Sequence, residues 1–276
     1  MTSQQQLFTD RTMVISGGSR GIGLAIARAV AQQGGNVVVL AKTAEPHPRL
    51  PGTVHTAVAE LEAAGGKAVA VVGDVRNEAD VRRAVEVGVD RFGGIDFCVN
   101  NAGAIATAPT AELTVKRFDL MQEINIRGTF LLTQACLPYL RQAPNPHVLN
   151  VSPPLNTSPR WLGAHPAYTQ SKYGMTLLAL GWAAEFAADG IAANCLWPQT
   201  YIATAAVANL PGGDELLRSA RDPRIMGDAA AEILSRPARD STGNCYVDAR
   251  VLIESGATDL SGYGGGTQPI PDMFLD

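Results

Sequence analysis

Short runs of apolar and β-branched residues alternate with helix-like stretches along most of this chain. The runs cover residues 12–16, 36–41, 67–72, 95–99, 147–151, 191–196 and 245–248. Each run has the length of one buried strand, and several end at glycine, asparagine or aspartate. This alternation predicts an α/β fold with a doubly wound, mostly parallel sheet of seven strands and helices on both faces.

Length and composition favour one compact unit. The chain has 276 residues, 46% of them apolar, and no linker divides it. We therefore expect a single domain over residues 1–276, with a core over about 10–255 and a tail over 256–276.

Charge and cysteine usage narrow the function classes. The net charge of −4 argues against nucleic acid as the main partner, and no apolar run approaches the ~18 residues of a membrane span. The four cysteines and four histidines lack metal-ligand spacing. Together with the polar start of the chain, this predicts a cytoplasmic protein with reduced thiols and no metal site.

A glycine-rich loop follows the first strand. It reads Gly17-Gly18-Ser19-Arg20-Gly21-Ile22-Gly23 and leads into an Ala-rich helical stretch. A strand, a glycine turn and a helix together place free backbone N–H groups where a phosphate can bind. The spacing is G-x-x-x-G-x-G, so a glycine turn without a ligand is an alternative that the loop alone leaves open.

Basic residues lie where the second strand ends. Lys42 follows residues 36–41, and the first acidic residue after it is Glu45. In a doubly wound fold this position faces the adenosine ribose, where an acidic residue suits NAD(H) and a basic one suits the 2′-phosphate of NADP(H). Arg20 is a second candidate cation. Each could instead be a solvated surface charge, but together they favour NADP(H).

Tyr168 and Lys172 lie four residues apart in a stretch with helical periodicity. They would share one helix face. Lowering a tyrosine pKa from about 10 to neutrality takes roughly 4 kcal/mol, and a positive charge ~4 Å away in a shielded site supplies about that much. The pair is therefore a plausible acid/base. The same spacing is also typical of a packed ring beside a solvated amine.

Three further segments carry predictions. Residues 112–140 predict a long helix that is broken near Gly128 and ended by Pro138, with Asn125 on a buried face as either a structural amide or a water-holding one. Residues 200–225 predict a mobile substrate-side segment. The tail from Gly262 to Asp276 is predicted to be irregular and free to dock on another subunit.

With these pieces assembled, the chain resembles the short-chain dehydrogenase/reductase family over residues 10–255, which implies a single-domain Rossmann fold. The match is carried, in the family's order, by the glycine loop, Asp74, residues 100–103, Asn125, and Tyr168 with Lys172. Residues 41–48, 151–156 and 167–175 look like the hydroxysteroid-dehydrogenase-like protein 2 branch, whose members often carry a C-terminal sterol-carrier-like domain. This chain stops about where that domain's linker would begin, which predicts a stand-alone reductase module.

The resemblance implies a role for each matching residue. Tyr168 would be the general acid/base, Lys172 would hold the nicotinamide ribose and lower the tyrosine pKa, and Asn125 would support a proton-relay water. Asp74 would contact the adenine. The implied cofactor-binding residues are Gly17, Ser19, Arg20, Gly21, Ile22, Gly23, Lys42, Asp74, Val75, Asn101, Ala102, Gly103, Tyr168, Lys172, Pro198, Ile202 and Thr204.

The chain departs from the family pattern at two places. The family's catalytic serine lies thirteen residues before its tyrosine, and here that position is Leu155. Ser152, Asn156 or Ser158 could supply the missing hydrogen bond, with Ser152 slightly favoured. Gln199 stands where a glycine usually follows the proline.

The prediction is therefore an NADP(H)-dependent oxidoreductase that interconverts a carbonyl and an alcohol on a small, apolar substrate, such as a lipid-derived one. NAD(H) is the less favoured cofactor. The alternative is a catalytically weak NADP(H)-binding regulatory or scaffolding module. Relatives usually pair through the two long helices, so a homodimer or homotetramer is also expected.

Overall fold

The computed structural model describes residues 6–47, 50–266 and 268–276. Within these ranges seven strands form one sheet in the order β3-β2-β1-β4-β5-β6-β7, and every neighbouring pair is parallel. The strands are β1 Thr12–Ser16, β2 Asn36–Ala41, β3 Lys67–Val72, β4 Phe97–Asn100, β5 His147–Val151, β6 Ala192–Trp197 and β7 Cys245–Val247. The predicted doubly wound α/β fold is confirmed, with a sheet that is parallel throughout.

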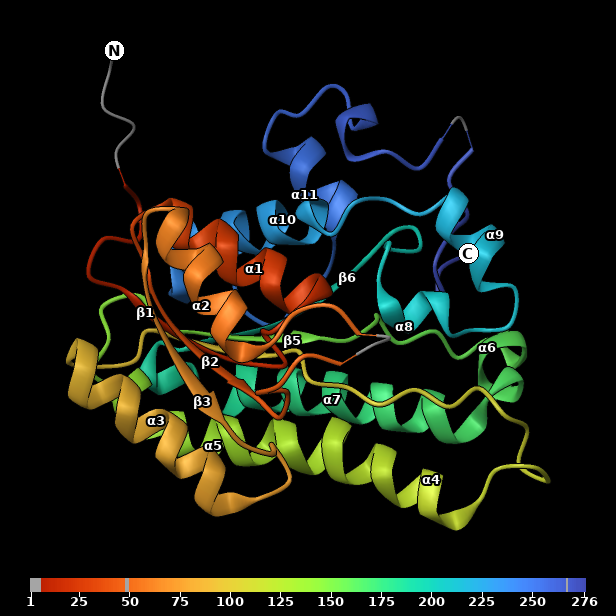
Figure 1. Ribbon diagram of the computed structural model, residues 1–276, viewed down its shortest axis with the longest axis horizontal. Coiled ribbons are helices and arrows are strands. Elements are labelled where there is room, and N and C mark those ends of the chain that lie inside the picture. Colours follow the sequence, from red (N-terminus) through yellow and green to blue (C-terminus); the bar gives the residue numbers. More distant parts are fainter. Residues whose placement is uncertain (1–5, 48–49, 267) are drawn as a thin grey trace.

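Helices cover both faces of the sheet (Figure 1). One face carries α1 (Gly21–Gln32), α2 (Val54–Ala63) and α10 (Arg224–Ser235); the other carries α3 (Glu78–Phe92), α5 (Thr129–Leu140) and α7 (Pro166–Glu185). Successive strand residues alternate between two cores, because side chains of a strand point to opposite faces. In β1, for example, Met13 and Ile15 pack toward α1, whereas Val14 packs toward α3.

Shorter helices complete the chain. They are α4 Val115–Met121, α6 Pro159–Ala164, α8 Ala205–Ala208, α9 Gly213–Arg218 and α11 Asp248–Glu254, with 3-10 turns at Ala187–Asp189, Ala238–Asp240 and Ser261–Tyr263. The segment after β6, predicted to be mobile, holds α8 and α9. No helix within the described ranges is long and apolar enough to cross a lipid bilayer.

The long helix predicted over residues 112–140 is divided differently from the prediction. It consists of α4, a π-helical turn η1 (Gln122–Gly128), and α5. The irregularity spans residues 122–128, so the break predicted near Gly128 is confirmed. Pro138, however, lies inside α5, which continues to Leu140. The prediction that Pro138 ends the helix is therefore wrong. Because Pro138 lies close to the end of α5, its missing N–H removes only one helical hydrogen bond.

The carboxyl ends of the central strands lie side by side. Ser16 of β1 is in register with Leu40 of β2 and with Asn100 of β4, and Asn100 is in register with Asn150 of β5. The loops that follow these strands therefore emerge at one edge of the sheet, which is where ligands bind in folds of this kind.

Candidate active site

A groove of about 1080 Å³ runs along this edge of the sheet. Its walls come from the loops after β1 to β4, from α7, and from the segment after β6. All the predicted cofactor-binding residues line it except Pro198 and Ile202. Both of these are buried, and Ile202 belongs to the core under α10.

The glycine loop has the shape that a phosphate cradle needs. Gly17 and Gly21 have φ of 69° and 55°, a left-handed conformation that side chains rarely adopt. A Cβ on Gly23 would overlap the carbonyl oxygen of Gly17 and the side-chain amide of Asn101. That amide donates to the Gly17 oxygen at 3.0 Å and so holds the loop against β4.

Helix α1 begins inside this loop without a side-chain cap. Its N-cap residue, Arg20, is extended and makes no capping hydrogen bond. The first N–H groups of α1 therefore face the groove for a ligand to use, with the positive end of the helix dipole behind them. Backbone of this kind fits the pyrophosphate of a nicotinamide dinucleotide.

Two cations at the outer end of the groove, where the sequence predicts the adenosine of the cofactor, have different surroundings. Arg20 donates from Nε to the Pro51 oxygen and from Nη2 to the Gly52 oxygen, both at 2.8 Å, so its guanidinium holds the backbone of residues 51–52 in place. Lys42 is 58% exposed and lies 3.7 Å from Asp74. Of the two, Lys42 retains more freedom to contact an added phosphate.

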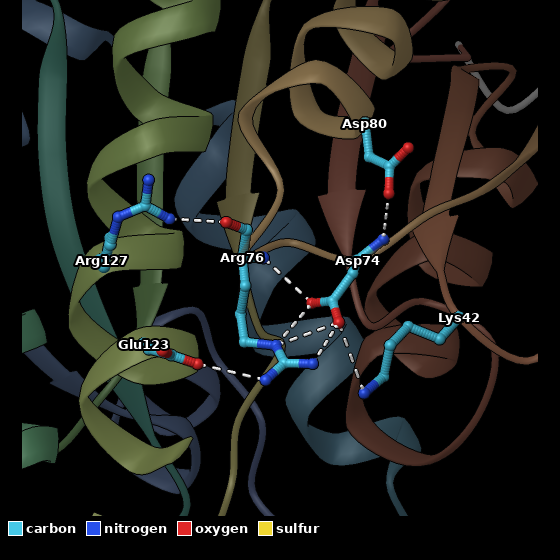
Figure 2. A network of polar contacts seen from close by, with 6 residues as sticks. All are labelled: Lys42, Asp74, Arg76, Asp80, Glu123 and Arg127. Carbon is cyan, nitrogen blue, oxygen red and sulfur yellow. Dashed lines mark hydrogen bonds and ion pairs between the residues drawn. The ribbon is translucent and has the colours of Figure 1, made fainter. Parts of the chain in front are cut away.

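Asp74 belongs to a charged network that joins β3 to η1 (Figure 2). Arg76 donates to its carboxylate at 2.7 and 3.0 Å, reaches Glu123 at 3.1 Å, and accepts a hydrogen bond from Arg127 on its carbonyl oxygen. Burial raises the pKa of Asp74, but the hydrogen bonds from Arg76 and the charge of Lys42 outweigh this and hold the pKa below its usual value. Asp74 therefore lies in the groove as an ionised, paired carboxylate.

Asn125 lies in the π-helical turn and is fully buried. Its amide accepts from the Ala104 N–H at 2.8 Å and donates to the Ala104 oxygen and the Ser171 hydroxyl at 3.0 and 2.9 Å. It thus ties the loop after β4 to α7, the helix that carries Tyr168. Asn125 therefore has the structural role that was one of the two alternatives from the sequence. The other alternative, that it holds a water, stays a prediction.

Tyr168 and Lys172 both line the inner end of the groove. Lys172 Nζ donates to the Val151 oxygen at 2.5 Å, approaches Met175 Sδ at 3.3 Å, and lies 5.2 Å from the ring centroid of Trp197. Burial lowers the pKa of Lys172 to about 8. Its ammonium is thus engaged at the end of β5.

Tyr168 is 6% exposed. Burial raises the pKa of its hydroxyl, and the nearby Asp272 and Tyr201 raise it further. The phenol is therefore held in its protonated form. The sequence predicted that Lys172 lowers the pKa of Tyr168. This stays a prediction for the protein with its cofactor bound.

The candidates for the missing serine differ in what they contact. Leu155 is exposed, whereas the Ser152 hydroxyl is buried beside the Cys195 thiol and has no well-formed hydrogen bond to any described residue. Asn156 Nδ2 donates to the Phe274 oxygen and to Asp276 at 3.2 and 2.8 Å, and Asn156 Oδ1 accepts from the Ser158 N–H. The side chain of Asn156 therefore serves as an anchor for the tail.

The side of Tyr168 away from the groove is packed with aromatic side chains that sequence reasoning did not single out. Phe274 lies at their centre, with ring centroids 5.3 Å from Tyr173, 5.7 Å from Trp161, 5.9 Å from Trp197 and 6.2 Å from Tyr168. The tail thus packs on its own chain. The isolated apolar triplet Met273-Phe274-Leu275 after a glycine-rich stretch is the sequence signal that could have indicated this docking.

Asp272 is a second residue that the sequence did not indicate. It is 7% exposed, and burial together with the neighbouring Asp248 raises its pKa to about 7, although Lys172 opposes this. A carboxyl that titrates near neutrality therefore lies close to Tyr168.

Comparison with known proteins is consistent with this geometry. Residues 11–213 match the family described as short chain dehydrogenase. Hydroxysteroid dehydrogenase-like protein 2 of Xenopus tropicalis is 51% identical over 267 residues, which is 96% of this chain and 63% of that protein. This chain thus spans less than two thirds of that relative's length.

Two solved structures share the fold closely. A protein from Xanthomonas campestris has a TM-score of 0.94 at 50% identity, covering 98% of this chain and 99% of the other. A short chain dehydrogenase from Mycobacterium thermoresistibile has a TM-score of 0.91 at 51% identity, covering 97% and 96%.

Proposed function

The chain belongs to the short-chain dehydrogenase family, and from this premise we propose that it is an NADP(H)-dependent oxidoreductase that interconverts a carbonyl and an alcohol on an apolar substrate, such as a lipid-derived one. One observation carries the proposal: a single groove has an uncapped glycine loop at one end and Tyr168 with Lys172 at the other. A nicotinamide dinucleotide is long enough to join a phosphate cradle to an acid/base in this way.

Each residue of the inner end has a chemical task in this proposal. The bound nicotinamide supplies or accepts the hydride. Tyr168 donates its phenolic proton to the substrate oxygen during reduction and takes it back during oxidation. Lys172 holds the ribose and favours the phenolate that forms when the proton has left. The burial that keeps Tyr168 protonated suits it to the reductive direction.

NADP(H) is proposed over NAD(H) because Lys42 follows β2 and is more than half exposed. An ammonium at this place can pair with a 2′-phosphate, and the carboxylate that would bind both ribose hydroxyls is missing from that position. Arg20, which holds residues 51–52, would keep the same end of the groove in shape.

The test is a turnover assay with the purified protein. NADPH and NADH are each offered with a panel of ketones and enoyl thioesters, and NADP⁺ with a panel of alcohols. We expect oxidation of NADPH with at least one apolar ketone, and slower oxidation of NADH with the same ketone. Absence of turnover on every panel, while NADPH still binds, would contradict the proposal.

That contradictory outcome corresponds to a second candidate function. A cofactor-binding regulatory or scaffolding module is favoured by Leu155, which offers no hydroxyl where the family has its catalytic serine, and by the use of Asn156 as a tail anchor. NADPH binding measured by fluorescence titration separates a silent binding module from a protein that does not bind the cofactor at all.

Self-association is a further proposal, as a homodimer or homotetramer. Phe130 on α5 and Leu177 on α7 are 42% and 58% exposed, which suits the pairing of these helices with a second copy. Light scattering that shows monomer alone would contradict this. A cytoplasmic location likewise stays a prediction from the sequence.

A further inference from the structure

The segment from residue 270 to 276 packs against the side of Tyr168 that faces away from the groove, and it is anchored along its length. The Asp272 N–H donates to the Gln199 oxygen at 3.0 Å, and the Tyr201 N–H donates to the Ile270 oxygen at 3.2 Å. Further along, Trp197 Nε1 donates to the Met273 oxygen at 3.0 Å. These contacts hold the segment beside the loop that follows β6.

Asp276 forms the outer latch of the segment. Its carboxylate accepts from Asn156 Nδ2 at 2.8 Å and from Trp161 Nε1 at 3.1 Å. These hydrogen bonds hold the pKa of Asp276 below its usual value, and the nearby charge of Arg160 contributes. The latch is exposed to solvent, so its hydrogen bonds exchange readily with water.

Phe274 occupies the centre of the aromatic cluster at a conformational cost. Its side chain is 1% exposed, and its φ of 73° places it in the left-handed region that bulky residues rarely adopt. Such a conformation costs about 1–3 kcal/mol, persists only where the surroundings enforce it, and is concentrated at functional sites. The four aromatic rings around Phe274 are what enforce it here.

The phenol of Tyr168 therefore has two very different sides. The cofactor groove reaches Tyr168, Lys172 and Trp197 and does not extend to Phe274. Beyond Tyr168 the space is filled by Phe274, together with Trp161 and Tyr173. A substrate that approaches Tyr168 from the side away from the groove needs the volume that Phe274 now fills.

The chain before the segment can act as its hinge. Gly264, Gly265 and Gly266 have φ of 78°, 92° and 63°, which glycine adopts without strain. Among the described residues, the segment forms one isolated β-bridge with the rest of the fold, between Thr200 and Pro271, and it is not a strand of the sheet. Its other contacts include side-chain hydrogen bonds and the packing of Phe274. It can leave without disrupting the sheet.

We propose that residues 270–276 form a gate over the substrate site, in which the ring of Phe274 holds the place of a flat apolar group of the substrate. A substrate reaches Tyr168 by displacing Phe274. The box of Trp161, Tyr173 and Trp197 then contacts the substrate as it now contacts Phe274, which makes Phe274 a specificity-determining residue. The inference rests on the proposed function for the role of Tyr168.

The first test compares two Phe→Ala variants in the full chain. Phe274→Ala opens the gate position, while Phe8→Ala removes an equally buried ring that packs on Phe97 far from the groove. The probe is 2-acetylnaphthalene with saturating NADPH. A closed gate hides the site in all but a minor fraction of molecules, so we expect the KM of Phe274→Ala to fall by about tenfold or more.

Phe8→Ala should keep the wild-type KM while losing stability. If Phe274 were instead a fixed wall of the pocket, Phe274→Ala would raise the KM or leave it unchanged, and the gate would be refuted. Equilibrium dialysis of 2-acetylnaphthalene in the presence of NADP⁺ gives the same comparison without turnover. Tighter binding to Phe274→Ala with no turnover by any variant would support the gate and refute the proposed oxidoreductase.

The second test loosens the latch and leaves Phe274 in place. Asp276→Asn keeps the size of the side chain but removes its charge. A Trp182→Phe background removes the tryptophan that stacks on Phe186, away from the tail, and leaves Trp161 and Trp197 as reporters. We expect acrylamide to quench this fluorescence at least twofold more steeply in Asp276→Asn. Equal quenching together with an unchanged KM would overturn the gate.

Discussion

The two sides of Tyr168 are built in opposite ways. On the cofactor side there is an open groove, shaped by glycine backbone and by residues that directly follow β1 to β4. On the other side the space is filled with aromatic rings from α6, α7, β6 and the tail. The contact that closes this second side, between Asn156 and Asp276, joins residues 120 positions apart.

This difference reflects what each kind of ligand requires. A phosphate is recognised by backbone N–H groups and small residues, which a short stretch of sequence can provide. An apolar group is recognised by the shape of a cavity, which depends on close packing between distant segments. We therefore propose that the open side binds the phosphate-containing cofactor and that the closed side selects among substrates.

The largest effect is expected from a change in Tyr168, the residue that the two sides share. Tyr168→Phe should lower kcat by about 10²–10⁴-fold, because the proton donor is lost, while the Kd for NADPH stays within a factor of about two. Steady-state kinetics and fluorescence titration check the two parts. Tyr139→Phe on α5 is the matched control, and comparable losses in both variants would contradict the role of Tyr168.

The closed side should have its own pH dependence. The pKa of Asp272 is about 7 in the fold against 3.8 ordinarily, because of burial first and Asp248 second, with Lys172 opposing and Tyr168 and Tyr201 nearby. The folded state thus resists an ionisation that the unfolded chain undergoes, so the contribution of Asp272 to the free energy of unfolding falls as pH rises from 4 to 7. The loss is on the order of 4 kcal/mol.

Asp272→Asn removes this ionisation and keeps an oxygen for the Met273 N–H. In denaturant titrations the variant should gain several kcal/mol over the wild type at pH 8 and little at pH 4. Burial lowers the pKa of His147 to about 4. The variant should therefore still lose the contribution of His147 to stability as pH falls from 6.5 to 4, as the wild type does. Equal stability of variant and wild type at pH 8 would contradict the burial of an ionisable Asp272.

The open side depends on the space left by its glycines. Gly23→Ala places a methyl group against the Gly17 oxygen and the Asn101 amide, and overpacking of this kind costs about 1–3 kcal/mol. We expect the Kd for NADPH to rise about tenfold or more. Gly181→Ala on α7, where no described atom outside the adjacent helix backbone and the two neighbouring residues lies within 4 Å of the added Cβ, should bind NADPH as the wild type does. An unchanged Kd in both variants would show that the loop does not hold the cofactor.

The smallest expected effect concerns the outer end of the groove. Lys42→Asp should shift the ratio of kcat/KM for NADPH and NADH toward NADH by about tenfold. This corresponds to the low end of the free energy of a charge-assisted hydrogen bond, because Lys42 is exposed to solvent and salt. Lys116→Asp, on the exposed face of α4, controls for the change in net charge. If both variants keep the wild-type ratio, Lys42 does not bind the 2′-phosphate.

Most of the fold could be predicted from local patterns. The runs at residues 12–16, 36–41, 67–72 and 147–151 coincide with β1, β2, β3 and β5. In β1, β2 and β5 the reason is that a strand buried on both faces needs an apolar run of that length, whereas β3 is a partly buried edge strand. The runs predicted at 95–99, 191–196 and 245–248 differ by one or two residues from β4, β6 and β7. The π-helical form of residues 122–128 was not predicted. Asn125 in this turn bonds to Ala104 and Ser171, which lie 21 and 46 positions away in the chain.

The candidate site likewise has residues that the sequence could predict and residues that it could not. Gly17, Lys42, Asp74 and Asn101 could be brought together from the sequence, since parallel strands end at one edge of a sheet and these residues follow them directly. Asp272 and Phe274 carry no local signature of a site. Their positions follow from a tail that crosses the molecule, and one chain segment does not encode which distant surface it meets.

The sequence by itself therefore determined the parallel sheet, the phosphate-type loop and the placement of Tyr168 beside Lys172 on one helix, because strand runs, glycine turns and helical spacing are set by near neighbours. The tertiary structure alone decided that Asn156 anchors the tail, that Phe274 covers Tyr168, and that Asp272 is buried near it. Those outcomes depend on packing among residues more than a hundred positions apart, where shape complementarity rather than local preference selects the contact.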